Sequence, residues 1–100
     1  MNDRISREEL VKMYNVEISF FNDLVESELL KVYTENEISY LMYDDLPIFE
    51  RFTNLHYDLD INLPGLEVIH NMLQKMEDLN SRNRELMRKL SAISDKYDDF

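Results

Sequence analysis

The sequence predicts a mainly α-helical protein with a small β-wing: a head that contains a helix-turn-helix unit, followed by one long C-terminal helix. Apolar residues recur at helical spacing in three short segments and alternate in only one, between residues 29 and 42. The only glycine, Gly65, follows Pro64, and beyond this break the helical pattern continues without interruption to about Ser94. We therefore expect a head over residues 1–62, a helix over residues 63–94 and a flexible acidic tail over residues 95–100.

The helix-turn-helix unit is predicted between residues 7 and 27. Ser6 and Glu9 have the spacing of a capping box, so the first helix should run from about residue 7 to residue 14. Asn15 tolerates the left-handed conformation that ends a helix. The second helix is expected over residues 17–27, and its predicted buried stripe consists of Ile18, Phe21, Leu24 and Val25.

The β-wing is predicted over residues 29–42, with a polar turn at residues 34–37. Its alternating side chains, expected to be half buried, are Leu30, Val32, Ile38, Tyr40 and Met42. Asp44 or Asp45 can cap a third helix that has Pro47 in its first turn and reaches about residue 58. The apolar face of this helix should consist of Ile48, Phe49, Phe52, Leu55 and Leu59. Among the aromatic side chains we expect Phe21, Phe49 and Phe52 in the core, whereas Phe20 could lie at the surface.

The long helix carries a heptad repeat. Asn62 is a good N-cap, and Pro64 falls in the first turn. The a and d positions predict a coiled-coil seam through which two copies of the chain associate; its residues are Met72, Met76, Leu79, Asn83, Leu86, Leu90 and Ile93. The alternative is that the near half of the helix folds back on the head while the far half frays.

The sequence leaves the orientation of this dimer open. A buried Asn83 would pair with its twin in a parallel dimer. The g positions Lys75, Arg82 and Lys89 meet Asn80, Met87 and Ser94 at e, which offers no complementary charges.

The chain is strongly acidic, with 11 basic and 21 acidic residues and a formal charge of -10. Residues 1–80 carry a net charge of -11 and residues 81–100 a net charge of +1. An acidic head repels a phosphate backbone and attracts basic protein surfaces. The mean hydropathy of -0.47 argues against a membrane protein, and without cysteine or a leader-like N-terminus we expect a cytoplasmic location.

Residues for catalysis or metal binding are not gathered in any recognisable motif. His56 and His70 fall on different predicted helices without a cluster of carboxylate ligands, and no serine lies in a nucleophile motif. We therefore expect no enzymatic activity, no metal and no cofactor.

The order of these elements resembles the MerR-type winged helix-turn-helix. Tyr14-Asn15-Val16 and Glu28-Leu29-Leu30 stand where that family has Tyr-Gly-Val and Gly-Leu-Leu. The third helix leads into Asp58-Leu59-Asp60-Ile61-Asn62-Leu63-Pro64-Gly65-Leu66, which is similar to the joint of the chaperone-modulator branch, CbpM. The CbpM resemblance implies a protein that binds the J-domain of a DnaJ-like co-chaperone, CbpA, and restrains it.

Two departures from the MerR pattern bear on function. Asn22 stands where a DNA-reading member commonly has an arginine, and Glu28 replaces the glycine of the second signature. Residues 17–28 contain no Lys or Arg, although DNA binders need cations for phosphate contacts. We therefore expect J-domain binding through carboxylates of the second helix and of the entry to the third helix, namely Glu17, Asp23, Glu26, Asp44 and Asp45.

Two other interpretations stay open. The same fold could serve a MerR-like DNA-binding transcriptional regulator, because fold alone does not determine function. The carboxylates could also do no more than keep a small protein soluble.

Overall fold

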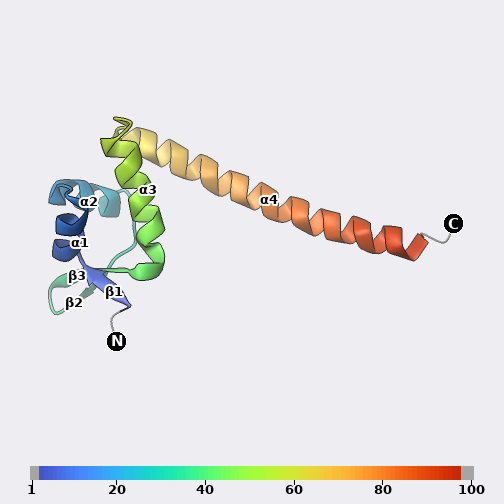
Figure 1. Cartoon of the computed structure of the whole chain (residues 1–100), viewed down its shortest axis with the longest axis horizontal. Coiled ribbons are helices and arrows are strands. Elements are labelled where there is room, and N and C mark those ends of the chain that lie inside the picture. The colour runs from blue at the N-terminus through green and yellow to red at the C-terminus, as the bar shows by residue number, and fades with distance from the viewer. Residues whose placement is uncertain (1–2, 98–100) are drawn as a thin grey trace. The chain divides into compact units, whose positions relative to one another are not determined.

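The computed structural model describes residues 3–97, and these residues confirm a mainly helical fold with a small antiparallel sheet and a long C-terminal helix (Figure 1). In chain order the elements are β1 (Arg4–Ser6), α1 (Arg7–Tyr14), α2 (Ile18–Glu26), β2 (Tyr33–Glu35), β3 (Ile38–Met42), the 3-10 helix η1 (Tyr43–Asp45), α3 (Leu46–Tyr57) and α4 (Leu63–Tyr97). The chain divides into two units, Met1–Val68 and Ile69–Phe100, so the start of α4 belongs to the head.

The ends of α1 and α2 explain why a short turn suffices between them. The Glu9 N–H donates to the Ser6 hydroxyl at 3.2 Å, which confirms the predicted cap of α1. Asn15, with φ 53°, ends α1, and the Val16 N–H then donates to the Val11 carbonyl at 3.0 Å. Both bonds satisfy backbone groups that a helix end leaves unpaired, so the turn is defined by local hydrogen bonds.

The end of α2 repeats this geometry with a less suitable residue. Glu28 has φ 61°, and the Leu29 N–H donates to the Leu24 carbonyl at 2.9 Å. This is the position of the signature glycine, and the backbone keeps the conformation that glycine favours although a glutamate occupies it.

The sheet has the strand order β1-β3-β2, and the sequence did not predict β1. Ile5 of β1 lies opposite Leu41 of β3, and both side chains are buried. Leu41 therefore faces the core, whereas Ile38 is 41% exposed and shares the outer face with its even-numbered neighbours. Tyr40 and Met42 are half buried, as predicted for the wing, whereas Ile38 is exposed. The residue of β3 that is fully buried, Leu41, lies at an odd position and was not among those predicted.

The rest of the wing follows the prediction more closely. Leu30 is buried and Val32 packs against the core. The turn is tighter than expected: Asn36 and Glu37 alone form it, both with positive φ, while Thr34 and Glu35 belong to β2.

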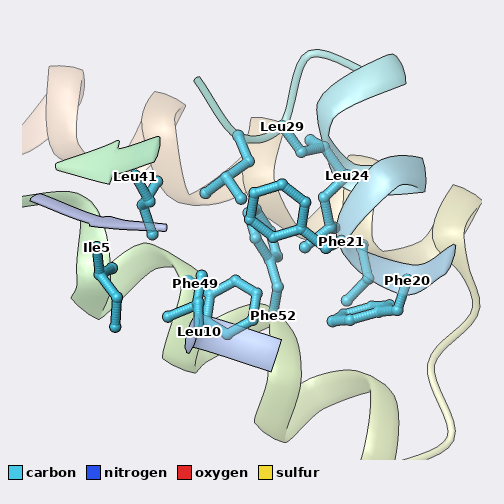
Figure 2. Packing of buried hydrophobic residues seen from close by; sticks show 11 residues of the cluster. Ile5, Leu10, Phe20, Phe21, Leu24, Leu29, Leu41, Phe49 and Phe52 are labelled. Carbon is cyan, nitrogen blue, oxygen red and sulfur yellow. The ribbon is translucent and has the colours of Figure 1, made fainter. Parts of the chain in front are cut away.

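The core of the head lies between the helices and the inner face of the sheet (Figure 2). Phe21, Phe49 and Phe52 are each at most 1% exposed, as predicted. Phe20 is also buried, whereas Ile18 is 44% exposed, so the buried stripe of α2 consists of Phe20, Phe21 and Leu24. Phe20 is buried because its ring contacts the rings of His56 and Tyr57 of α3. Helical spacing alone does not reveal these contacts, so the predicted stripe included Ile18 and omitted Phe20.

The ends of α3 and the connection to α4 differ from the prediction in two details. Asp45 occupies the N-cap of α3 without a side-chain hydrogen bond, while Pro47 lies in the first turn as expected. Leu59 is 65% exposed, because α3 ends at Tyr57 and Leu59 no longer lies on its apolar face. Asp60 follows with φ 56° and turns the chain toward α4.

Asn62 caps α4 as predicted, since its side-chain oxygen accepts from the Gly65 N–H at 2.9 Å. Leu66, fully buried, fixes the first turns of α4 within the head. The helix continues to Tyr97, so residues 95–97 of the expected tail are helical; residues 98–100 of that tail lie outside the described residues.

Candidate functional site

The exposed face of α2 is acidic and contains no cation. Asp23 and Glu26 are exposed and one helical turn apart, opposite the buried stripe of the same helix. Asn22, half buried, accepts a hydrogen bond from the Arg7 Nη1 at 3.3 Å. Asn22 is therefore itself the acceptor for a cation of α1.

A shallow hollow of about 110 Å³ lies where the start of α2 meets the end of α3. The Tyr57 hydroxyl accepts from the Glu17 N–H at 3.1 Å, which fixes the first turn of α2 on α3. The Phe20 and His56 rings stack with centroids 4.6 Å apart, and His56 Nδ1 lies 2.8 Å from the Ile61 carbonyl oxygen. The residues that line the hollow are Glu17, Ser19, Phe20, Asp23, His56 and Leu63.

The five predicted binding carboxylates fall into two groups. Glu17 and Asp23 share the hollow, and Glu26 extends the same face of α2. Asp44 and Asp45 lie in η1, at the opposite end of α3 from Tyr57. Twelve residues of α-helix rise about 18 Å, so the structure does not bring the two groups together.

Two cations of the head, Arg4 and Arg7, are paired with neighbouring carboxylates. Arg4 Nη1 lies 2.6 Å from Glu35, and its guanidinium stands 4.0 Å from the centroid of the Tyr40 ring. The hydrogen bond to Glu35 raises the pKa of Arg4. Arg7 forms an ion pair with Glu8 at 2.7 Å, and the hydrogen bond from Arg7 lowers the pKa of that carboxyl group. These pairs are at the surface and leave the excess of negative charge uncompensated.

One further titratable group is strongly perturbed, on the side of the head where α1 meets α3. The Tyr14 hydroxyl donates to a Glu50 carboxylate oxygen, which raises the pKa of Tyr14 to about 12. Its ring packs edge-on against Phe49 at 5.3 Å. This bond joins α1 to α3 and is a contact that stabilises the head.

The aromatic contacts that shape the hollow were not predicted from the sequence. Phe20, His56 and Tyr57 hold the start of α2 against α3. A signal was present, because Phe20 precedes Leu24 by four residues, which places it on the same helical stripe as that predicted core residue.

The predicted seam lies along one stripe of α4, and its apolar members are between 54% and 60% exposed in the single chain. The seam residues at a and d are Met72, Met76, Leu79, Asn83, Leu86, Leu90 and Ile93. They follow one uninterrupted helix, as a heptad repeat requires.

Within residues 3–97 no group of three or more potential ligand side chains could hold a metal ion. His56 instead contacts two aromatic rings and a backbone carbonyl. In the same part of the chain, no helix is both long and apolar enough to cross a bilayer.

Comparison with known proteins agrees with the fold and with the helix-turn-helix arrangement of α1 and α2. A family model described as MerR HTH family regulatory protein matches residues 5–88. No curated protein and no solved structure matches the chain. Since the matched segment extends from β1 through most of α4, the chain belongs to the MerR helix-turn-helix family of regulatory proteins.

Proposed function

We propose that this protein is a non-enzymatic regulator that binds the J-domain of a DnaJ-like, CbpA-type co-chaperone and inhibits it by occlusion. The observation that carries the proposal is the chemistry of α2. A helix-turn-helix protein that reads DNA inserts its second helix into the major groove, where cations contact phosphates. Here α2 offers Asp23 and Glu26 at its exposed face and contains no Lys or Arg.

The wing has the same character as α2. Its tip consists of Asn36 and Glu37, both exposed, while the neighbouring Glu35 is paired with Arg4. In a winged helix-turn-helix protein the wing lies beside the second helix, so the two elements that would approach a phosphate backbone both repel it. A basic protein surface, by contrast, is attracted to both.

The inhibition would need no covalent chemistry. The carboxylates of α2 would cover cations of the J-domain that its chaperone partner must otherwise contact, and the bound head would exclude that partner sterically. Electrostatic complementarity of this kind acts mainly on the association rate. Affinity beyond it would come from apolar side chains beside the carboxylates, such as the exposed Ile18.

The proposal is tested by measuring association of a purified CbpA-type J-domain with the full chain over a range of salt concentrations. The variant carries Asp23→Lys and Glu26→Lys. A matched control carries Glu77→Lys and Asp78→Lys, which change the net charge equally but lie on α4. We expect the α2 variant to lower the association rate constant about tenfold or more at low salt, and the control to change it about threefold at most.

Two results would contradict the proposal. The first is the absence of binding between the unmutated chain and the J-domain in the micromolar range, and the second is an equal reduction of the association rate by both variants. The second result would mean that only total charge matters and that α2 is not the contact surface.

The second candidate is a MerR-like DNA-binding transcriptional regulator. It is favoured by the family match and by a helix-turn-helix whose turn and caps are formed. Selection from a random duplex library followed by gel shift distinguishes the two candidates. Sub-micromolar, salt-sensitive binding to a selected duplex would establish DNA binding and make α2 a DNA-reading helix despite its charge.

A further inference from the structure

We infer that the hollow between α2 and α3 receives one arginine side chain of a partner protein. The inference rests on the proposed function in one respect, because the J-domain is the partner expected to supply that arginine. Three properties of the hollow carry it: its volume, the hydrogen-bonding character and charge of its polar groups, and the apolar surface beside them.

The volume of the hollow limits what can occupy it. At about 110 Å³ it has room for the liquid volume of about four water molecules. Pockets for drug-sized ligands measure about 300–1,000 Å³, so this hollow is too small for a ligand of that kind. A single side chain, entering from a docked protein surface, is an occupant of suitable size.

The polar side chains of the lining offer acceptors. Glu17 and Asp23 contribute carboxylates. The one hydroxyl, that of Ser19, donates to Glu17 Oε2 at 3.3 Å. His56 Nδ1 carries the proton of a neutral imidazole, because the Ile61 carbonyl 2.8 Å away can only accept, and Nε2 is then an acceptor as well. An occupant with several donors and no acceptor complements this lining.

The charge of the lining favours a cation. Neither Glu17 nor Asp23 forms an ion pair within residues 3–97, so an arriving cation is attracted to both without displacing an internal partner. The start of α2 contributes a partial positive charge of about half an elementary charge, which two carboxylates outweigh. The hollow therefore attracts a positively charged occupant.

The apolar part of the lining selects arginine among the cations. The Phe20 and His56 rings are stacked with their planes 11° apart, and the half-buried Leu63 adds an aliphatic contact. Arginine has methylene groups that pack on such surfaces, and its planar guanidinium supplies five donors and is weakly hydrated. Lysine has the same charge, but its compact ammonium group is strongly hydrated and should bind more weakly.

Contacts within the head hold the hollow in shape. The Tyr57 hydroxyl accepts from the Glu17 N–H, and the Tyr57 ring packs edge-on against Phe20 with centroids 5.3 Å apart. Leu63 begins α4 and belongs, like the other lining residues, to the unit Met1–Val68. Because its walls are already packed, the hollow needs little ordering when an arginine enters, which favours binding.

A small probe tests the hollow without a partner protein. N-acetyl-arginine amide is titrated into the full chain while two-dimensional NMR follows the backbone amides, with N-acetyl-glutamine amide as the neutral control. We expect saturable shifts for the arginine amide with a dissociation constant on the order of 1–10 mM, and none for the glutamine amide. The shifts should be largest at Ser19, Phe20, Asp23, His56 and Leu63.

A matched pair of variants separates the hollow from the overall charge. Asp23→Asn and Asp44→Asn make the same chemical change, and both side chains are exposed and without hydrogen bonds within residues 3–97, so both variants should fold. Asp23→Asn should weaken binding of the arginine amide about fivefold or more, and Asp44→Asn about twofold at most. Equal effects of the two variants, or no saturation at tens of millimolar, would overturn the inference.

The same variants connect the hollow with the proposed partner. An enclosed charge pair slows dissociation, whereas a distant charge acts mainly on association. With a purified CbpA-type J-domain, Asp23→Asn should raise the dissociation rate constant about tenfold, and Asp44→Asn about twofold at most. Equal dissociation rates of the two variants would overturn the inference and leave J-domain binding intact. Saturation by the arginine amide without any J-domain binding would support the hollow as an arginine site and refute the proposed function.

Discussion

Replacing Glu28 with glycine should stabilise the head. Glu28 is exposed and holds φ 61° because the hydrogen bonds at the end of α2 require a left-handed residue there. This conformation costs a residue with a Cβ about 1–2 kcal/mol, since the Cβ approaches the following carbonyl oxygen. Glycine does not have this cost but loses about 0.4–1 kcal/mol more backbone entropy on folding. The difference predicts a net gain of about 1 kcal/mol in the free energy of unfolding.

Urea and thermal denaturation measure this gain through tyrosine fluorescence, because all tyrosines except Tyr97 lie in the head. For a domain of this size, 1 kcal/mol corresponds to a rise in Tm of about 4–8 °C. Glu28→Ala is the matched control, since it removes the charge and keeps the Cβ. It should stay within about 0.5 kcal/mol of the unmutated protein. Equal stabilities of the Gly and Ala variants would refute the reasoning from backbone strain.

Two further predictions concern single contacts in the head. Tyr14→Phe keeps the ring against Phe49 but removes the hydrogen bond to Glu50, so it should lower the free energy of unfolding by about 1 kcal/mol at neutral pH. Because folding raises the pKa of Tyr14 from 10.0 to about 12, this difference should persist below pH 10 and vanish as the pH rises through 12; a constant difference in urea titrations would contradict it. Gly65→Ala would place a Cβ 2.7 Å from Ile61 Cγ2, and should destabilise the head by about 1–2 kcal/mol despite the better helix propensity of alanine. The loss should largely disappear in an Ile61→Ala background, as a double-mutant cycle by urea denaturation would reveal.

The helix boundaries were predictable because their causes are local. Ser6 and Asn62 cap helices through hydrogen bonds to N–H groups three residues later, which the sequence displays directly. Asn15 ends α1 in the conformation that its side chain tolerates. Each of these interactions lies within one helical turn, so spacing and residue type were sufficient to predict it.

The sheet was less predictable because its pairing is not local. Strand β1 has only three residues, too few for its alternation to be recognised, and its partner β3 begins more than thirty residues later. Ile38, Tyr40 and Met42 have the residue types of a buried face, yet Leu41 points inward because Ile5 lies opposite it and the helices cover that side. Composition cannot tell which face of a strand meets a helix when both faces carry apolar residues.

The carboxylates of the candidate site could be named from the sequence, but not their grouping. The contacts of Tyr57 with Glu17 and of His56 with Phe20 attach the start of α2 to the end of α3, and they join residues about forty positions apart. The surface of α2 and its N-cap residue Glu17 therefore contains three of the five predicted carboxylates, and it adjoins a hollow that His56 and Leu63 also line.

Asp44 and Asp45 stand at the far end of α3, so a partner would have to extend along the whole helix to contact both groups. A compact domain that covers α2 has no need to reach that far. In the proposed complex the carboxylates of η1 attract the J-domain only through the electrostatic field of the acidic head. This attraction is stronger at low salt, and at physiological ionic strength it fades beyond a Debye length of about 8 Å. The carboxylates of α2 differ because they would be covered by the partner, and a covered charge must be matched by a cation of the J-domain or weaken the complex.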